Sequence, residues 1–419
     1  MTAAPDGRAR RAALAVFAAA LALRVGYVVR QGPPPPVAGD AIEYRAYADS
    51  LATTGRFEGL NGDRATRMPL YPALLAAVGS LAGPSTRAVQ WTQCLLGALA
   101  CVFVYYWGLA LLRPRWALAC GLAAAAYHDL IVPASWPLTE AVYGFLLAAS
   151  FCALYRRELP LRRRALLGGL GLGLTYLVRP EVLPFSVLIL GGAPLLLPGF
   201  TRRAAALALA VFLAAPALWI GRNALILGRF LPTTSVGNKV VYYGLSLPLE
   251  HLGHAPVYDA AANRPEFERD AEYRQAFQAL RAATPWPRRA TAYAFNLLTV
   301  YYPFLPRYDW TYGVLVPFWL LGLCFAVARR DLWPAAGLVA GLSVMFAFVA
   351  GPVSRYRFGF SPCLILLAGA GAQELYDRTR GSKRFQWGAG VWAAANVAAY
   401  FASAGLRQWA LLLKACLWR

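Results

Sequence analysis

The stretch RAALAVFAAALALRVGYVVRQGPPPPVAGDAIEY, residues 11–44, joins one apolar block to four prolines and then to two carboxylates. Residues 12–30 are long enough to cross a bilayer as a helix, and three arginines lie just before or at the start of this block. Such arginines mark the cytoplasmic end of a span, so we expect a cytoplasmic N-terminus and a retained membrane anchor. Asp40 and Glu43 then follow where the chain would meet water on the outer side.

The whole chain has the composition of a membrane protein. Of its 419 residues, 59% are hydrophobic and 15% are charged, and the mean hydropathy is +0.46. Soluble proteins carry about 25% charged residues. Apolar blocks of roughly 15 to 25 residues recur between arginine clusters, which is typical of membrane-spanning helices and not of one large soluble core. The sequence predicts an all-α polytopic membrane protein.

The formal net charge of +21 does not indicate a nucleic-acid-binding protein. The arginines are dispersed between apolar blocks, and the positive-inside rule and anionic lipids explain them, so we expect membrane lipid and no nucleic acid as partners. The seven cysteines lie in or beside apolar blocks without a CxxC motif. No motif for a metal site is present, and a divalent metal is left open as a cofactor.

About eleven transmembrane helices place every short basic connection on the cytoplasmic side. The predicted spans are 12–30, 88–112, 116–133, 137–155, 164–178, 181–199, 203–222, 311–328, 332–351, 358–375 and 386–404. This topology leaves two long segments outside the cytoplasm, at residues 31–87 and 223–310. Because loops of this length usually carry function, we expect the functional site there.

Two further apolar segments are interpreted as interfacial helices in these outer loops. The segment 68–83 is short for a span, and counting it as one would turn every later arginine cluster outward. The same argument places 291–306 at the outer membrane surface. The expected division is a cytoplasmic N-terminus at 1–11, a transmembrane domain carrying the site at 12–375, and a basic loop with a C-terminal membrane helix at 376–419.

Asp40 and Glu43 allow two interpretations. In a helix from residue 41 to about 54, ended by Gly55, Asp40 would be the N-cap and Glu43 the N3 residue, which is the capping-box spacing. Tyr44 would lie beside Glu43 on one face of this helix. Alternatively, a carboxylate at membrane depth is a functional candidate and can act as a general base.

Other polar residues are expected at the same depth. Arg67 precedes a proline turn, and Arg355 and Arg357 lie outside against the positive-inside trend. An outer arginine beside a span needs an anionic partner such as phosphate, although snorkelling to lipid headgroups is an alternative. The remaining candidates lie near the ends of other blocks, and among them Arg179 and Glu181 are expected to pair with each other: His128, Asp129, Glu140, Arg179 and Glu181.

The order of these motifs resembles the GT-C superfamily. GD-x-x-x-Y-x-x-Y-A at 39–48 is followed by R-x-P-L-Y-P at 67–72, R-P-E at 179–181 and R-Y-R at 355–357. Within that superfamily the chain is similar to protein O-mannosyltransferase and aminoarabinose-transferase type enzymes. The resemblance implies transfer of a sugar from a polyprenyl-phosphate donor to a lipid, glycan or protein outside the cytoplasm, with Asp40 as the catalytic carboxylate.

Several further roles follow as expectations. Glu43 and Glu140 are candidates for a second acid, and the donor phosphate would contact Arg355, Arg357, Arg67 and Arg179. The acceptor or sugar would contact Tyr44, His128, Asp129 and Glu181. Many members have adjacent acids at the first motif, whereas here Gly39 precedes Asp40 and the next acid is Glu43.

Two other functions fit the same sequence. A transporter or flippase of lipid-linked saccharides would need the same phosphate site but no general base, and a non-enzymatic scaffold for the cell envelope would need neither. The early acid in a long outer loop favours an inverting hexosyl or pentosyl transferase, located in the inner (plasma) membrane of a bacterium. No GxxxxGK[ST] motif is present, which argues against an ATP-driven pump.

Overall fold

The computed structural model describes residues 7–34, 37–254, 256–260, 263–304, 308–379, 382–405 and 408. Within these residues the regular elements are helices, and the one other feature is an isolated antiparallel bridge between Phe304 and Tyr308. The prediction of an all-α chain is confirmed. Two compact units are formed, the first by Met1–Thr233, Leu315–Val339 and Phe358–Asp377, and the second by Thr234–Val314, Ala340–Arg357 and Arg378–Arg419.

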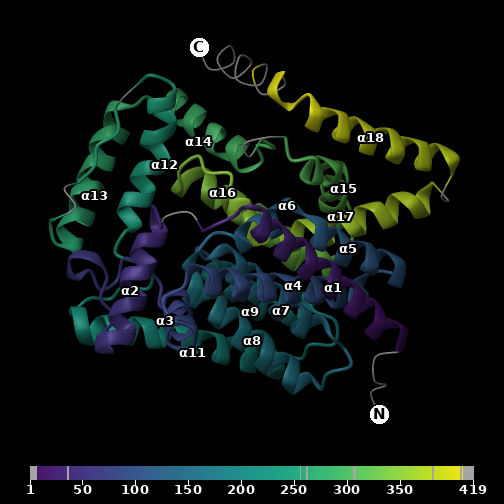
Figure 1. Ribbon diagram of the computed structural model, residues 1–419, viewed down its shortest axis with the longest axis horizontal. Coiled ribbons are helices and arrows are strands. Elements are labelled where there is room, and N and C mark those ends of the chain that lie inside the picture. Colours follow the sequence, from purple (N-terminus) through teal and green to yellow (C-terminus); the bar gives the residue numbers. More distant parts are fainter. Residues whose placement is uncertain are drawn as a thin grey trace. The chain divides into compact units, whose positions relative to one another are not determined.

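Most helices belong to the first unit (Figure 1). They are α1 (Gly7–Arg30), α2 (Asp40–Thr54), η1 (Leu60–Gly62), α3 (Leu70–Ala82), α4 (Thr86–Leu111), α5 (Pro114–Ala126), α6 (His128–Ile131), η2 (Val132–Ala134), α7 (Glu140–Tyr155), α8 (Leu161–Val178), η3 (Pro180–Val182), α9 (Leu183–Gly191), α10 (Ala193–Leu196), α11 (Arg202–Leu227) and η4 (Arg330–Leu332). The second unit contains α12 (Gly237–His251), α13 (Glu266–Ala283), α14 (Trp286–Val300) and α18 (Lys383–Phe401). Three helices contribute residues to both units: α15 (Trp310–Ala326), α16 (Trp333–Val349) and α17 (Tyr356–Arg378).

Among the described residues, five helices are long and apolar enough to cross a membrane: Gly7–Arg30, Thr86–Leu111, Arg202–Leu227, Arg330–Val349 and Tyr356–Arg378. A sixth span results if α5 and the following helical segment, which are bent by 65° at Tyr127, are counted together. Each of the eleven predicted blocks contains a helix, but several helices are short or interrupted, as where Gly192 separates α9 from α10. The chain is therefore a membrane protein, and the number eleven is not confirmed.

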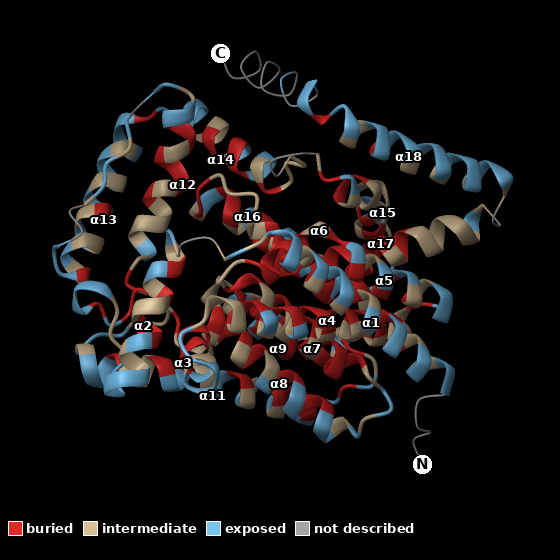
Figure 2. Ribbon diagram, viewed as in Figure 1, coloured by how far each residue is buried: buried red, intermediate tan, exposed pale blue. Residues whose placement is uncertain are grey.

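The first unit is held together by close packing of α4, α7, α8 and α11. Helix α4 packs against α1, α5 and α7, and α8 packs against both α7 and α11. Glycine allows close approach of α8 and α11: a Cβ atom at Gly169 of α8 would lie 2.3 Å from the carbonyl oxygen of Ala208 on α11. Small residues serve this purpose where membrane helices meet. Buried residues gather along α4 and α7 (Figure 2).

The second unit has its own small core. Leu245 and Leu249 of α12 pack with Ala292 of α14. Asn296 is fully buried on α14, and its amide donates to the carbonyl oxygens of Gly244 and Ala347 at 2.6 and 3.0 Å, which ties α14 to α12 and α16. The predicted outer-surface segment 291–306 is helical only up to Val300, and residues 305–307 lie outside the described part.

Candidate active site

Helix α2 places the two early acids in its first turn. It begins at Asp40, and its N-cap is Gly39, which has a positive φ of 58° that a residue without a Cβ adopts at little cost. The prediction that Asp40 is the N-cap and Glu43 the N3 residue is therefore wrong by one position. Gly55 ends the helix as predicted, in the left-handed conformation, with its N–H donating to Leu51.

Arg67 binds both acids. Its Nη2 donates to Oδ1 of Asp40 at 2.7 Å, and its Nε donates to Oε2 of Glu43 at 2.8 Å. The guanidinium also lies over the ring of Tyr44, with 5.0 Å between its central carbon and the ring centroid. Burial lowers the pKa of Arg67, but Tyr44, Glu43 and Asp40 outweigh burial and raise that pKa above its ordinary value. The guanidinium is therefore always charged.

Tertiary contacts fix the loop that carries Arg67. The hydroxyl of the buried Tyr47 lies 2.9 Å from Oγ1 of Thr66 and accepts a hydrogen bond from the Thr66 N–H at 3.1 Å. The Tyr47 ring stacks on Phe57 with centroids 4.3 Å apart. Arg222 of α11 donates to the carbonyl oxygens of Arg64 and Phe57. The segment 55–67 is thus held between α2 and α11, and Arg67 is positioned before any ligand arrives.

Arg179 forms a second cluster at the end of α8. Its Nε lies 2.5 Å from Oε1 of Glu181, which confirms the predicted pairing of these two residues. Its Nη1 lies 3.6 Å from Oε1 of Glu140, the first residue of α7, which is only 4% exposed. The guanidinium lies over the ring of Tyr143. Like Arg67, Arg179 joins two carboxylates that come from different turns or elements.

Two tyrosines connect these clusters. The rings of Tyr44 and Tyr71 meet edge to face with centroids 5.1 Å apart, and the Tyr71 hydroxyl donates to Oε1 of Gln93 on α4 at 2.9 Å. Burial raises the pKa of the Tyr44 phenol, with Arg67 and Arg179 opposing this and Asp40 and Glu140 adding to it. Charges of both clusters therefore act on one ring. We call these six ionisable residues the acid–arginine cluster: Asp40, Glu43, Arg67, Glu140, Arg179 and Glu181.

His128 and Asp129 lie where α5 ends and α6 begins. Asp129 is fully buried, and Oγ of Ser361 on α17 donates to it at 3.4 Å. His128 is half-buried. This contact joins α6 to α17 within the first unit, whereas the acid–arginine cluster is built on α2, the 55–67 loop, α7, the end of α8 and η3.

Arg355 and Arg357 belong to the second unit. Arg357 is fully buried and stacks on Tyr312, with 3.8 Å between its central carbon and the ring centroid. Its Nη1 donates to the carbonyl oxygens of Val300 and Tyr302, and its Nη2 lies 3.8 Å from Oδ2 of Asp309. Arg355 is half-buried in the turn before α17.

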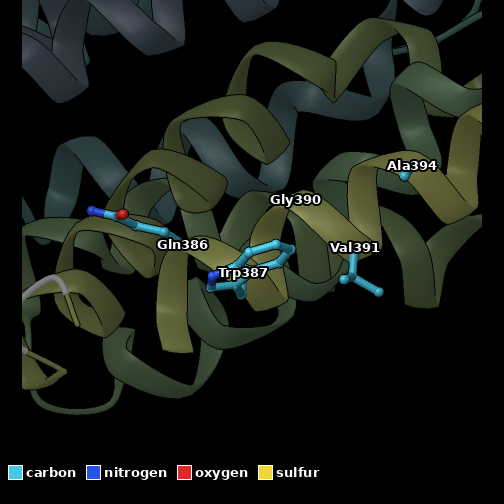
Figure 3. A pocket seen from close by; sticks show the side chains of 5 residues that line it. All are labelled: Gln386, Trp387, Gly390, Val391 and Ala394. Carbon is cyan, nitrogen blue, oxygen red and sulfur yellow. The ribbon is translucent and has the colours of Figure 1, made fainter. Parts of the chain in front are cut away.

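Sequence reasoning missed several of the residues that support these sites. Gln93 lies inside an apolar block and Arg222 lies at the end of one. A polar residue at such a position indicates a functional or structural role, and this signal could have identified both residues. Tyr71 lies in the quoted R-x-P-L-Y-P motif, but nothing local indicated that its ring would touch Tyr44. A shallow depression of about 400 Å³ on α18 is lined by Gln386, Trp387, Gly390, Val391 and Ala394 (Figure 3). Its lining contains no ionisable group, and none of the candidate residues lies there.

The comparisons with known proteins concern the fold. No protein-family model matches the chain, and no curated protein matches its sequence. The archaeal oligosaccharyltransferase AglB from Archaeoglobus fulgidus, in complex with an inhibitory peptide and a dolichol-phosphate, matches with a TM-score of 0.52 and 12% identity, over 96% of this chain and 56% of that chain. The apo form of the A. fulgidus oligosaccharyltransferase matches with a TM-score of 0.51 and 12% identity, over 95% and 55% of the two chains. ArnT from Cupriavidus metallidurans, bound to undecaprenyl phosphate, matches with a TM-score of 0.41 and 14% identity, over 87% and 77%.

The chain thus shares the overall fold of the A. fulgidus oligosaccharyltransferase structures. It spans about half of the length of the oligosaccharyltransferase structures that it matches. At these identities the likeness establishes the architecture, and the chemistry has to be argued from the residues themselves.

Proposed function

We propose that this chain is a glycosyltransferase that moves a sugar from a polyprenyl-phosphate donor to an acceptor outside the cytoplasm. The observation that carries the proposal is the acid–arginine cluster, in which Asp40, Glu43 and Arg67 of the first long loop lie near Glu140, Arg179 and Glu181 at the ends of α7 and α8. The matched oligosaccharyltransferase is named for glycosyl transfer, and its structure holds a dolichol-phosphate. A lipid-linked donor is consistent with a site that lies beside membrane-spanning helices.

Asp40 is the proposed general base. The acceptor hydroxyl oxygen attacks the anomeric carbon, its proton passes to the Asp40 carboxylate, and the bond from that carbon to the phosphate oxygen breaks with its electron pair. Phosphate is a competent leaving group without protonation, so one base suffices. The displacement inverts the anomeric configuration. The Asp40 side chain is 33% exposed and hydrogen-bonded to the guanidinium of Arg67, so it is both accessible and oriented.

The negative charge that develops on the donor phosphate needs cations. The proposed ligands are Arg355, Arg357, Arg67 and Arg179. Within the first unit, Arg67 is already oriented by two carboxylates, so an arriving phosphate would not have to order this side chain. The lipid tail would lie against the membrane helices.

The remaining roles complete the proposal. Glu43 and Glu140 are the second-acid candidates, and Tyr44, His128, Asp129 and Glu181 would face the sugar or acceptor. The enzyme would lie in the inner (plasma) membrane of a bacterium with its N-terminus, residues 1–11, in the cytoplasm. Residues 12–375 would form the catalytic domain, and 376–419 a basic loop and a final helix.

The test is sugar transfer in membranes that lack the endogenous protein. Membranes carrying wild type, Asp40→Asn, Asp49→Asn or empty vector would receive a radiolabelled polyprenyl-phosphate sugar pool, and label leaving the lipid fraction would be counted. Asp49 is the matched control because it lies on the same helix, is 61% exposed and pairs only with Arg45 among the described ion pairs. We expect transfer with wild type and Asp49→Asn and none with Asp40→Asn.

Equal release of label from the lipid fraction with wild type and Asp40→Asn would contradict the role of Asp40 as base. Label that stays in the lipid fraction with both proteins would overturn the transferase. A transporter or flippase of lipid-linked saccharides would then fit better, because such a protein needs the phosphate site but no base. Retention of the anomeric configuration in the product would contradict the single displacement and leave Asp40 as a nucleophile.

A further inference from the structure

Arg67 makes the most specific polar contact in the outer loop. Two donors of one guanidinium, Nη2 and Nε, reach Oδ1 of Asp40 and Oε2 of Glu43 at 2.7 and 2.8 Å. The planar fork of arginine fits two such acceptors, which a lysine ammonium does not reproduce. The side chain is 19% exposed, whereas those of Asp40 and Glu43 are 33% and 35% exposed. The Arg67 side chain is thus more buried than the two carboxylates that it binds.

Two carboxylates in the first turn of one helix repel each other. Asp40 and Glu43 are three residues apart on α2, so their charges repel unless a positive group lies between them. Divalent ions with oxygen ligands commonly fill such a position. In this chain Oδ1 of Asp40 and Oε2 of Glu43 both accept hydrogen bonds from Arg67, and the guanidinium lies over the ring of Tyr44.

Hydrogen bonds on the loop that precedes Arg67 also fix the position of its backbone. The hydrogen bonds between Tyr47 and Thr66 fix the backbone one residue before Arg67. Arg222 holds the carbonyl oxygens of Phe57 and Arg64 in the same segment. Arg67 is thus a covalently attached cation that lies over an aromatic ring, follows an anchored loop and binds both carboxylates.

We propose that Arg67 is the built-in counter-cation of the Asp40–Glu43 pair and takes the place that a divalent ion would otherwise occupy, so that sugar transfer at this site does not require an added divalent metal. This inference rests on the proposed function. Besides its proposed contact with the donor phosphate, Arg67 then also acts as a positioning residue for Asp40, because its hydrogen bond fixes the direction of that carboxylate. Glu43 is a positioning residue as well, because its bond to Nε turns Nη2 toward Asp40.

The kinetic experiment uses the full-length purified chain in detergent. Wild type, Arg67→Ala, Arg67→Lys and Arg64→Ala would be assayed for label transfer with EDTA, with Mn²⁺, and with added methylguanidinium. Arg64 is the matched control because it lies three residues away, is 46% exposed and pairs with Glu58. We expect EDTA to leave the wild-type rate unchanged and Arg67→Ala to lower kcat about 100-fold, the size typical of losing one preorganised charge partner.

Rescue separates a charge role from a merely structural one. Methylguanidinium is expected to restore part of the rate of Arg67→Ala but none of the rate of Arg67→Ala/Asp40→Asn. Arg67→Lys is expected to stay impaired, because an ammonium does not bridge both acids. Loss of wild-type activity in EDTA with recovery in Mn²⁺, or a wild-type rate in Arg67→Lys, would overturn the inference.

A second readout does not depend on transferase activity. Mn²⁺ binding to wild type and to Asp40→Asn/Glu43→Gln would be followed by electron paramagnetic resonance, with size-exclusion elution as the folding control. We expect no difference between these two proteins, because Arg67 already occupies the acids. Tight Mn²⁺ binding to wild type that the double substitution abolishes would overturn the inference. If wild type transfers no label from any donor, the proposed function fails, and the Mn²⁺ titration still decides the role of Arg67.

Discussion

Nη2 of Arg67 lies 2.7 Å from Oδ1 of Asp40, although 27 residues separate them in the sequence. This contact closes the first outer loop onto the start of α2. The sequence offered one of these residues as a base and the other as a phosphate ligand. Their pairing means that any variant of one changes the electrostatics of the other, so effects of single substitutions at the two positions will not be additive.

The Tyr47 hydroxyl is expected to stabilise the loop that carries Arg67. Tyr47→Phe removes the partner of both the Oγ1 and the N–H of Thr66 in a buried environment, which costs about 1–3 kcal/mol. Thermal unfolding in detergent should show a lower Tm for Tyr47→Phe. Thr66→Ser keeps the hydroxyl and is the control. Equal Tm values for wild type and Tyr47→Phe would show that the hydrogen bonds do not hold the loop.

The contact between α8 and α11 depends on glycine at position 169. A Cβ atom there would lie 2.3 Å from a backbone oxygen of Ala208, so Gly169→Ala has to push the helices apart and should cost about 1–3 kcal/mol. Gly191→Ala is the matched control, because a Cβ atom at Gly191 meets nothing within 4 Å. We expect a lower Tm for Gly169→Ala only. The packing would be looser than described if both variants melt like wild type.

Removing Arg179 is expected to be more harmful than removing Glu181. Arg179→Ala leaves Glu140, 4% exposed, without its guanidinium partner, and breaking such a buried pair costs about 3–5 kcal/mol. Glu181→Gln keeps Arg179 in place and removes a partner whose side chain is 14% exposed. The fraction of monodisperse protein and the Tm would be compared for the two variants. A less stable Glu181→Gln would reverse the expected order.

Tyr312 is expected to orient Arg357. Tyr312→Leu removes the ring on which the guanidinium stacks, worth about 2 kcal/mol for a desolvated pair, while the carbonyl partners Val300 and Tyr302 remain. If Arg357 contacts the donor phosphate, Tyr312→Leu raises the KM for donor and leaves the KM for acceptor unchanged. Tyr308→Phe, at a tyrosine that donates to Asn396 in the same unit, is the control. An unchanged KM for donor in Tyr312→Leu would indicate that Arg357 does not contact the donor phosphate.

The extent of sequence-based prediction differs between local and distant features. The end of α2 at Gly55 and the pairing of Arg179 with Glu181 were predictable, because both depend on residues within a few positions of each other. The start of α2 was misplaced by one residue, since Asp40 is a good N-cap type and the favourable φ of Gly39 was not considered. The location of Arg357 on the outer side of the membrane stays a prediction, and no local pattern indicated that its side chain would be fully buried against Tyr312.

The sequence by itself determined that the chain is a helical membrane protein, because hydrophobic length and arginine placement act on each segment independently. It also singled out acids and arginines as candidate site residues, since ionisable side chains are costly at membrane depth and therefore rare there. Only the tertiary structure decided which of them meet. Arg67 reaches Asp40 and Glu43 because Tyr47, Thr66 and Arg222 fix the loop between them, and such contacts join residues up to 165 positions apart, which no local pattern encodes.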